Sequence, residues 1–531
     1  MGSSNFATLS FLCIFLLLVS TSSCADEENF LQCLDFHSQN SIPVYTPNTS
    51  SYRSILESPI YNLRFLSSTF RKPLFIVTPM QESHVQTTVT CCKKHGLQLR
   101  VRSGGHDFEG LSSISTVPFV ILDLVHHRSI NVDIEDNSAW VQAGATIGEL
   151  YYRIAEKSKV HAFPAGLCPT VGVGGHISGA GYGVLIRKFG VSADYVLDAR
   201  IVNADGEILD RKSMGEDLFW ALRGGGGASF GVILAWKIQL VHVPPTVTIF
   251  IIPKTLEQGA TSILHKWQFI ADNVDEDLFI GISIRPEDKV DPKEGKTILV
   301  SFLGIFLGGP EELLQHMDHS FPELGLKRHD CIEMSWIKSA VVFGVFSTEV
   351  PLNALLDKKN PFPPKSFHRV KSDYVKEPLS VTVLEEIWRR FLEMGVHKPE
   401  IIMSPYGGRM NEISESAIAF PHRKGNIYKI NYIIEWFDEE TNTAKKHTSW
   451  IRDLYKYMTP YVSKSPRASY LNFKDIDLGH TKNGTASYSE AYKAWGSKYF
   501  KNNFKRLTQI KAKVDPNNFF WNEQGIPLLS S

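Results

Sequence analysis

Hydrophobic and polar positions between residues 71 and 245 alternate in short segments that predict strands and helices in turn. A strand is predicted where a short run of apolar β-formers is bounded by polar or turn residues, and a helix where apolar positions recur every three or four residues. The predicted strands are 74–77, 97–101, 119–124 and 139–143, and the predicted helices are 82–95 and 146–156. This region therefore has an alternating α+β character.

The flanking regions have different patterns. Residues 26–70 begin with a short helical segment and continue as a stretch rich in Ser, Thr, Pro and Asn. Residues 246–465 combine long amphipathic helices, predicted at 255–273 and 381–394, with strand-like runs such as 297–306. From residue 466, turns rich in Asn and Asp lead to an aromatic helix at 488–504. A chain of 531 residues is long for one core, so we expect two or three domains.

The segment 426–436 is the most informative strand. Because side chains in a strand alternate between two faces, every second residue from Tyr428 to Trp436 forms an apolar face suited to a core. Lys429, Asn431 and Glu435 lie on the other face. Two interpretations stay open at this stage. The strand is either an edge strand with one solvated side, or part of a sheet floor that lines a pocket with a cation and an amide.

A second candidate lies at 469–477, where an extended backbone would put Tyr470 and Asn472 on one face. A phenol near a lysine could be held toward its phenolate and act as a base, which suggests a pair of Tyr470 and Lys429. The alternative is a core tyrosine whose hydroxyl is hydrogen-bonded.

The first 25 residues are typical of a secretory signal peptide. An apolar run from Leu9 to Val19 is too short to span a bilayer, and small residues follow at 23–25. A buried helix is the alternative interpretation. We expect a chain without a membrane span that enters the secretory pathway and reaches the extracellular space, the cell wall or the vacuole. Asn48 and Asn483 lie in sequons and are then expected to be glycosylated.

The charge balance and the cysteines limit the classes of partner and site. Lys plus Arg and Asp plus Glu are both 56, so no excess of positive charge points to nucleic acid. Of seven cysteines, the five beyond the signal are Cys33, Cys91, Cys92, Cys168 and Cys331. An odd number leaves at least one thiol without an intramolecular partner in an oxidising compartment. Their scattered positions make a poor metal site, and no metal is expected.

Two glycine-rich stretches hold the candidate chemistry. Residues 102–110 set His106 among glycines, and residues 165–175 do the same for Cys168. Glycines let the backbone approach a ligand closely, and further runs at 172–183 and 223–231 suit a cradle for a large phosphate-bearing cofactor better than a flexible linker. Neither run fits the dinucleotide fingerprint G-x-G-x-x-G, so a nicotinamide enzyme of the doubly wound type is disfavoured.

Five ordered motifs together resemble the plant berberine bridge enzyme family. They are R-S-G-G-H-D-x-E-G, G-x-C-P-T-V-G-V-G-G-H-x-S-G-x-G-Y-G, L-R-G-G-G-G-A-S-F-G-V, Y-x-N-x-x-D-x-D-L-G and V-D-P-x-N-F-F. Members of this family are secreted FAD-linked oxidases of the vanillyl-alcohol-oxidase group. The resemblance implies an α+β fold: a two-part FAD-binding domain of the PCMH type plus a substrate domain whose antiparallel sheet is covered by helices. The expected division is a signal at 1–25, FAD-domain parts at 26–70 and 71–245, a substrate domain at 246–465, and a C-terminal segment at 466–531 that returns to the FAD domain.

The resemblance also assigns roles on the cofactor side. It implies a bicovalent FAD, attached through its 8α-methyl group to His106 and through C6 to Cys168. It pairs Cys33 with Cys91, although the adjacent Cys92 could compete, and it places an oxygen gate at Val171, where valine goes with access for molecular oxygen. The further residues implied to contact FAD are Arg102, Ser103, Gly104, Gly105, Gly172, Gly174, Gly175, His176, Gly179, Tyr182, Val232 and Asn472.

On the substrate side, the chain departs from better-understood relatives. Asn431 stands where reticuline oxidases carry a glutamate base, and an amide cannot take the proton at neutral pH. Phe473 and Lys429 replace the tyrosine base and a glutamate of cannabinoid-forming members, and Phe108 replaces a frequent tyrosine. The catalytic candidates are therefore Tyr470, Lys429, Asn431 and Tyr182.

The function expected from the resemblance is a two-electron oxidation. Hydride would pass from a carbon of a small-molecule substrate to flavin N5, Tyr470 would remove a hydroxyl or phenol proton, and oxygen would reoxidise the flavin to give H2O2. An alkaloid or phenolic alcohol is favoured over a sugar because Phe108 and Phe473 make the pocket less polar. The alternatives are a carbohydrate or oligosaccharide oxidase, a flavin-bearing cyclase without net redox chemistry, and a non-catalytic binding protein. A monomer is expected.

Overall fold

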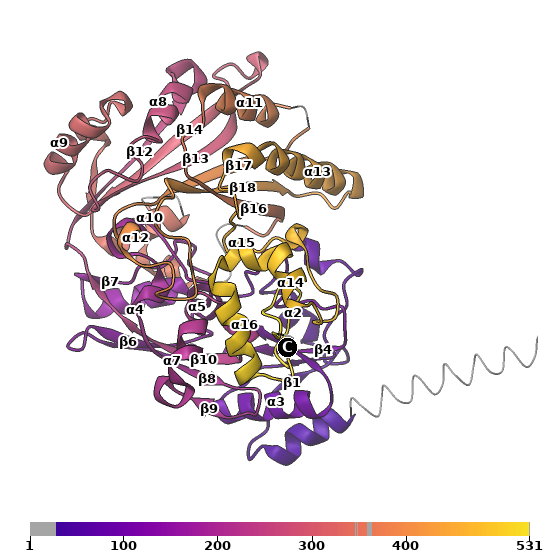
Figure 1. Ribbon diagram of the computed structural model, residues 1–531. Helices are drawn as coiled ribbons and strands as arrows, with labels where there is room; N and C mark the ends of the chain where they lie inside the picture. Colours follow the sequence, from indigo (N-terminus) through magenta and orange to yellow (C-terminus); the bar gives the residue numbers. More distant parts are fainter. Residues whose placement is uncertain (1–27, 346, 348, 358–363, 394, 530–531) are drawn as a thin grey trace, which may run out of the picture.

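The computed structural model describes residues 28–529 except 346, 348, 358–363 and 394. Two smaller sheets with their helices form the lower half of the molecule in Figure 1, and a large sheet crosses the upper half. The expected signal segment, residues 1–25, lies outside the described residues. Within the described part of the chain, no helix is long and apolar enough to cross a membrane, and no group of His, Cys, Asp and Glu side chains could hold a metal ion.

Two sheets make up the glycine-rich half. The first has the order β1-β2-β4-β3, with β2, β4 and β3 parallel and β1 antiparallel. The second is antiparallel, with the order β5-β6-β10-β8-β9, and β7 pairs with β11. Their strands are β1 Val44–Tyr45, β2 Phe75–Val77, β3 Gln98–Arg102, β4 Phe119–Asp123, β5 Ile130–Asp133, β6 Ser138–Gln142, β7 His161–Ala162, β8 Val196–Val202, β9 Ile208–Leu209, β10 Val232–Gln239 and β11 Val241–His242.

The helices of this half follow the predicted pattern where prediction was possible. The helices expected at 82–95 and 146–156 are confirmed as α3 and α4, and a helix covers residues 28–37. The named helices are α2 Tyr52–Glu57, α3 Glu82–Lys94, α4 Ile147–Lys157, α5 Val173–Ser178, α6 Ile186–Phe189 and α7 Arg211–Leu222.

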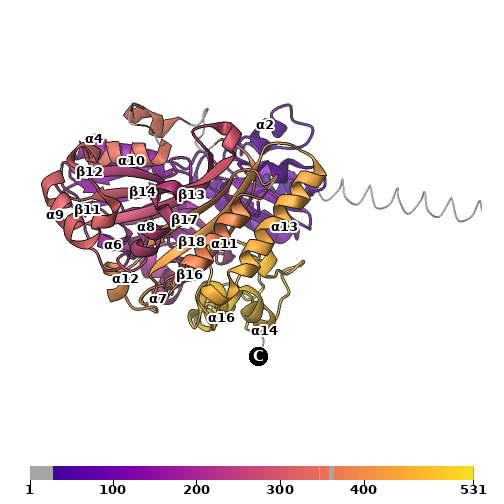
Figure 2. The same ribbon diagram turned by 90° about the horizontal axis from the view of Figure 1, so that it is seen from above.

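The large sheet is antiparallel and has seven strands in the order β15-β12-β14-β13-β17-β18-β16. Helices α8, α9, α11 and α13 cover the face turned away from the smaller sheets, and Figure 2 shows α11 and α13 lying across it. The strands are β12 Val247–Thr255, β13 Leu278–Asp288, β14 Lys296–Phe306, β15 Ile332–Met334, β16 Phe367–Val375, β17 Pro399–Pro405 and β18 Tyr428–Trp436. The helices are α8 Ala260–Trp267, α9 Pro310–Ser320, α10 Trp336–Val345, α11 Val381–Phe391, α12 Arg409–Glu412 and α13 Thr441–Tyr457.

The strand predicted at 426–436 is β18, and its interpretation as an edge strand is wrong. It lies between β17 and β16, hydrogen-bonded on both sides. Its apolar face, from Tyr428 to Trp436, packs into the core beneath the covering helices. Lys429 and Asn431 on the other face are 0% and 2% exposed, because the glycine-rich half covers that face. The strand therefore belongs to a sheet floor that faces the other half of the molecule, as the second interpretation predicted.

Two predicted helices are interrupted. The helix expected at 255–273 is shorter, because β12 runs to Thr255 and α8 begins only after Gly259, whose φ of +81° favours glycine. The aromatic helix expected at 488–504 breaks at Lys501, whose φ is +46°. Its parts are α14 Tyr488–Ala491, a π-helical turn Tyr492–Gly496, α15 Ser497–Phe500 and α16 Asn503–Val514. The helix expected at 381–394 ends at Phe391 as α11, and its expected last residue, Met394, lies outside the described residues.

The end of the chain returns to the first sheet. In Figure 1 the C-terminal helices lie beside the glycine-rich half. The side chain of Arg100 on β3 forms an ion pair of 2.6 Å with Glu523, and both residues are buried. Gln98 on the same strand donates a hydrogen bond to the carbonyl of Trp521. The last 30 residues thus pack against the first sheet.

A buried arginine joins the two halves. Arg187 of α6 is 1% exposed and donates to five carbonyls: three between α8 and β13, one at the first residue of β13 and one just after β17. The acceptors are the carbonyls of Ala271, Val274, Asp275, Leu278 and Tyr406. Because a guanidinium carries five N–H donors, this one side chain satisfies a whole turn of buried backbone.

A disulfide joins Cys33 to Cys91, as the resemblance implied, and Cys92 and Cys331 are buried thiols outside it. The disulfide closes a loop of 58 residues, which ties the N-terminal helix to α3. Cross-linking restricts the unfolded chain, and typical native disulfides contribute roughly 2–4 kcal/mol.

The Cys33→Ser, Cys91→Ser double variant is expected to lose roughly 2–4 kcal/mol in its free energy of unfolding, because its unfolded chain is less restricted. Chemical denaturation under non-reducing conditions measures this. A reducing agent should lower the stability of the wild type and leave the double variant unchanged. Equal sensitivity of both proteins to the reducing agent would contradict the assignment.

Candidate active site

His106 and Cys168 meet at the hydroxyl of Thr170. The Nε2 atom of His106 lies 3.0 Å from Oγ1 of Thr170, and the sulfur of Cys168 lies 3.6 Å from the same oxygen. The ring of Tyr61 stacks on the imidazole with 3.7 Å between ring centroids. Burial lowers the pKa of His106 to about 3, which keeps its imidazole neutral, and burial raises the pKa of the Cys168 thiol.

The glycines of the two stretches let their backbones cross in contact. A Cβ on Gly104 would lie 2.3 Å from the backbone nitrogen of Gly172, and a Cβ on Gly172 would lie 2.3 Å from that of Gly104. Gly105 has a φ of +74°, which side chains rarely adopt. At Gly179, a Cβ would lie 1.9 Å from Oδ1 of Asn472. Any larger residue at these positions would therefore separate the segments that hold His106 and Cys168.

Other predicted cofactor residues act within the protein. The guanidinium of Arg102 binds Asp123 at 2.7 Å and the carbonyls of residues 55 and 56, so only its backbone could approach a ligand. Ser103 donates to the carbonyl of Ala143. Val232 is fully buried at the start of β10. The backbone at Gly174 packs on Ala143, whereas a Cβ on Gly175 would meet no atom within 4 Å, which leaves that position open to a ligand.

The ring of His176 braces the loop around the second stretch. Its Nε2 atom accepts a hydrogen bond of 3.1 Å from the backbone N–H of Gly166, and its carbonyl accepts one from the amide of Asn472. Burial lowers its pKa to about 4. The neutral ring, fixed by Gly166, therefore helps to position the residues that follow Cys168.

Lys429 lies in a box of aromatic rings. Its Nζ atom is 4.0 Å from the ring centroid of Phe473, 4.6 Å from that of Tyr182 and 4.9 Å from that of Tyr470. It donates a hydrogen bond of 2.7 Å to Oδ1 of Asn431. Burial lowers the pKa of Lys429 well below 10.5, which favours the neutral amine. Asn431 and Lys429 thus act together on the floor, as the period of β18 predicted.

Tyr470 reaches this box from a turn. The extended backbone expected at 469–477 is wrong, because the N–H of Phe473 donates to the carbonyl of Tyr470 and closes a turn. Tyr470 and Asn472 meet all the same, through a hydrogen bond of 3.0 Å from the Asn472 amide to the phenol oxygen. The N–H of Gly181 donates to that oxygen at 3.0 Å.

The phenol of Tyr470 is not held toward its phenolate. Burial raises its pKa well above 10, and the neighbouring phenols of Tyr182 and Tyr406 raise it further. Lys429 faces the ring of Tyr470 and is itself driven toward the neutral amine, so it does not lower the phenol's pKa as expected. The two groups start as a neutral pair. Tyr182 is also a neutral phenol, since burial raises its pKa to about 12.

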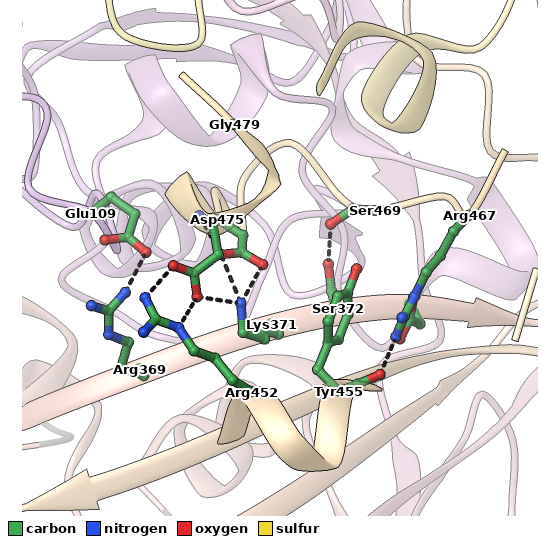
Figure 3. A network of polar contacts seen from close by, with 12 residues as sticks. Glu109, Arg369, Lys371, Ser372, Arg452, Tyr455, Arg467, Ser469, Asp475 and Gly479 are labelled. Carbon is green, nitrogen blue, oxygen red and sulfur yellow. Dashed lines mark hydrogen bonds and ion pairs between the residues drawn. The ribbon is translucent and has the colours of Figure 1, made fainter. Parts of the chain in front are cut away.

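Buried ion pairs hold the turn of Tyr470 against the edge strand β16 (Figure 3). Lys371 binds Asp475 at 2.8 Å and Asp477 at 2.8 Å. Arg467 binds Asp373, and the hydroxyls of Ser372 and Ser469 lie 3.0 Å apart. These contacts clamp the segment on both sides of Tyr470.

The same cluster reaches the His106 loop. Glu109, three residues after His106, pairs with Arg369 on β16 at 3.6 Å and with Arg64 at 3.7 Å. Burial raises the pKa of Glu109 to about 7 in spite of both arginines. β16 therefore links the segment of Tyr470 to the loop of His106.

Val171 is half-buried beside His106 and Cys168. Its N–H donates to the carbonyl of Cys168, and its carbonyl accepts from the N–H of Ile147 at the start of α4. Phe108 stacks on Phe473 with 4.9 Å between ring centroids. The two phenylalanines that replace phenols in the family thus lie together and make one apolar wall.

Several site residues were missed by sequence reasoning. Thr170 and Tyr61 beside His106, and Ser404 beside Tyr182, are examples. Thr170 lies two positions after Cys168 in the same motif, so its place in the sequence was a signal. Tyr61 lies in a segment without any pattern, and only the fold brings it to His106.

Comparison with known proteins fits this geometry. Residues 73–211 match the family described as FAD binding domain, and residues 469–527 match the one described as berberine and berberine like. A tetrahydroberberine oxidase of Berberis wilsoniae is 76% identical over 531 residues, covering 100% of this chain and 99% of the relative. The chain belongs to the berberine bridge enzyme-like family. It is therefore an FAD-linked oxidoreductase.

Two further members of the family show its range. Monolignol oxidoreductase AtBBE-like 13 of Arabidopsis thaliana is 50% identical, covering 99% of this chain and 98% of the relative. A solved structure of the grass pollen allergen Phl p 4 is 44% identical with a TM-score of 0.88, covering 95% of this chain and all of that one. It is described as a glucose dehydrogenase in a variant with one asparagine-to-histidine substitution, and as a glucose oxidase when an isoleucine-to-valine substitution is added. The expected PCMH-type α+β fold is confirmed.

The residues present fit FAD. The crossing glycine backbones and the open position at Gly175 suit a cradle for its phosphates and ribityl chain. His106 and Cys168 are partly buried nucleophiles that contact the same hydroxyl, and no described residue hydrogen-bonds to Nδ1 of His106. Lys429, Asn431 and Tyr470 lie on the opposite side, on the floor sheet and its clamped turn.

Lys429→Met is expected to raise the stability of the protein, most strongly at low pH. The folded state lowers the pKa of Lys429, so between that pKa and 10.5 the unfolded chain binds a proton that the folded chain does not. Wild-type stability therefore falls as the pH decreases from 10.5 through this range. Methionine binds no proton in either state, so it removes the cost of deprotonating the lysine on folding. The free energy of unfolding across pH measures the difference, with the exposed Lys212→Met as control; a variant less stable than the wild type at pH 6 would contradict it.

Proposed function

We propose that this protein is a secreted FAD-dependent oxidase that takes hydride from an alkaloid amine and passes the electrons to oxygen, giving H2O2. The observation that carries the proposal is the 76% identity, over the whole chain, to a tetrahydroberberine oxidase. A second relative of that name, from Argemone mexicana, is 50% identical over the full chain. Bound FAD supplies the hydride acceptor, at the N5 position of its flavin.

Tyr470 and Lys429 together act as the proton acceptor at this site. An alkaloid amine is largely protonated at neutral pH, and hydride leaves the carbon next to nitrogen only when the nitrogen lone pair is available. The neutral pair of phenol and amine can take one proton from the substrate. The proton can then rest on Nζ of Lys429, where Asn431 and three ring faces stabilise the ammonium.

The shape and charge of the floor support an aromatic cation as substrate. Phe108 and Phe473 form an apolar wall, and Asn431 and Tyr182 offer polar groups for orientation. Farther along the same face, Glu400 and Glu435 are half-buried carboxylates on neighbouring strands. They accept hydrogen bonds from Ser283 and Ser366, respectively. Burial raises the pKa of both side chains, and a protonated amine beside them would favour their charged form, which a neutral sugar would not do.

Support for oxidase over dehydrogenase chemistry comes from Val171. Valine at the oxygen gate goes with oxygen access in the family. In the Phl p 4 variants, an isoleucine-to-valine substitution separates a glucose dehydrogenase from a glucose oxidase. We propose the same role for Val171 beside the two flavin anchors, with FAD held bicovalently through His106 and Cys168.

The proposed secretory route rests on the signal pattern and on the disulfide between Cys33 and Cys91, which requires an oxidising compartment. Asn48 and Asn483 are both exposed, as glycan acceptors must be. The cell wall, the extracellular space and the vacuole all satisfy these conditions.

Two other substrates are favoured by particular relatives. The monolignol oxidoreductase supports a phenolic alcohol, whose hydroxyl proton the same pair would remove. The glucose-oxidising Phl p 4 supports a carbohydrate, which the apolar wall disfavours. A cyclase without net redox chemistry is distinguished by anaerobic mixing, because only an oxidase bleaches its flavin with substrate.

Peroxide release is expected with tetrahydroberberine and not with glucose, and Tyr470→Phe is expected to lower kcat by roughly 10²- to 10⁴-fold because the proton-accepting pair is broken. A substrate panel of tetrahydroberberine, coniferyl alcohol and glucose with peroxide detection measures both. Wild-type turnover should fall as the pH is lowered, since the pair then holds a proton before substrate arrives.

Tyr428→Phe is the matched control, because this buried tyrosine lies on the opposite face of β18 and donates to Gln268. It should leave turnover unchanged. Unaltered turnover in Tyr470→Phe would remove Tyr470 from the mechanism. Turnover with glucose in place of the alkaloid would overturn the substrate proposal and leave the oxidase proposal standing.

Flavin is expected to stay with the denatured wild-type protein, since two bonds hold it. His106→Ala and Cys168→Ala should each retain flavin through the remaining bond, and the double variant should release all of it in acid. Mass spectrometry of flavin peptides, with absorbance of the acid supernatant, measures this. Complete release from the wild type would contradict covalent attachment.

A further inference from the structure

The hydroxyl of Thr170 contacts both of the proposed flavin-attachment groups, the imidazole of His106 and the thiol of Cys168. Thr170 is 5% exposed, and its Oγ1 atom lies 3.0 Å from Nε2 of His106 and 3.6 Å from the sulfur of Cys168. The ring of Tyr61 stacks on the imidazole of His106. A hydroxyl has one proton, so it can donate to only one of its two partners, His106 or Cys168.

One arrangement of protons satisfies both contacts. The hydroxyl has a single proton, and when this proton is donated to the sulfur of Cys168 the oxygen can only accept from the imidazole. Nε2–H of His106 then donates to Oγ1 of Thr170. Nδ1 of His106 is left with its lone pair, and no described residue hydrogen-bonds to it.

The turn that follows Cys168 affects the pKa of its thiol. Burial raises this pKa, and hydrogen bonding by Thr170 and Val171 lowers it. The hydroxyl of Thr170 acts in the same direction. A thiolate forming at this position therefore has the Thr170 hydroxyl as a donor, 3.6 Å from the sulfur.

We propose that Thr170 is the positioning residue for flavin attachment: its hydroxyl fixes the imidazole tautomer that exposes Nδ1 of His106 and donates to the sulfur of Cys168. The inference rests on the bicovalent attachment proposed above. Each attachment replaces one C–H bond of the flavin, and one N–H or S–H bond of the protein, by a C–N or C–S bond. The two protons and two electrons released reduce one O2 to H2O2. The proton of His106 leaves from Nε2, toward the oxygen of Thr170.

The test compares Thr170→Val, which keeps the shape and loses the hydroxyl, with Thr170→Ser, which keeps the hydroxyl. Holoproteins are digested, and the flavin peptides of His106 and Cys168 are quantified by mass spectrometry. Thr170→Val should form both bonds roughly 10- to 100-fold more slowly than the wild type, as expected for the loss of hydrogen bonds to charged or charging groups. Thr170→Ser should attach flavin like the wild type. Thr508→Val, a buried threonine of α16 that donates to the carbonyl of Lys505, is the matched control.

A pH step separates this role from a merely structural one. Purified Thr170→Val, incubated aerobically with its flavin at pH 7 and pH 9, should gain the Cys168 bond faster at pH 9, because alkali forms the thiolate that the hydroxyl no longer favours. The His106 bond should not recover, since alkali does not change the tautomer of a neutral imidazole.

Wild-type levels of both bonds in Thr170→Val would overturn the inference, and so would an equal, pH-independent loss of both. Absence of both bonds from the wild type would instead overturn the proposed bicovalent attachment. If Thr170→Val does not fold, Thr170→Ala, which also lacks the hydroxyl, should show the same slowed attachment, and unchanged attachment there would count against the inference.

Discussion

The site depends on the buried ion pairs that fasten the C-terminal segment to β16. Lys371, Asp475 and Asp373 are almost completely buried, Arg467 is largely buried, and a buried charge requires its partner. The segment between Arg467 and Asp475 therefore has one position on the sheet. That position puts the phenol of Tyr470 against the N–H of Gly181 and its ring beside Lys429. Residues nearly 300 positions apart thus form one pocket wall, and Glu109 extends the same cluster to the loop of His106.

Much of the fold follows from local pattern. The alternation along β18 predicted which side chains face the core and which face the other half, because a strand has a period of two whatever its neighbours are. The pattern could not say whether the second face was solvated, since that depends on the order of strands in the sheet. Helices were overextended where one backbone angle decides the end: Gly259 and Lys501 both have positive φ, and hydrophobic periodicity continues past them.

The site was predictable where chemistry lies in one motif and unpredictable where the fold assembles it. His106, Cys168 and the glycines around them were recognised from contiguous residues, and the resemblance chose Cys91 over Cys92 for the disulfide found in the structure. Tyr61 and Ser404 lie in segments without a signal, so only the fold shows them. Arg102 shows the opposite case: its motif suggested a cofactor contact, yet its guanidinium binds Asp123 and two carbonyls.

The protonation states connect the two sides of the pocket. Burial without a compensating charge drives Lys429, Tyr470, Tyr182 and His106 to their neutral forms, so the floor and the anchors carry no fixed charge near the reacting atoms. A neutral imidazole is the nucleophilic form that flavin attachment needs, and a neutral amine is the form of lysine that can accept a proton. Both follow from the same dry interface between the sheet and the glycine-rich half. Charge at the site then arrives with the substrate, which favours a protonated amine: it brings both the positive charge that favours the charged form of Glu400 and Glu435 and the proton that the Tyr470–Lys429 pair can take.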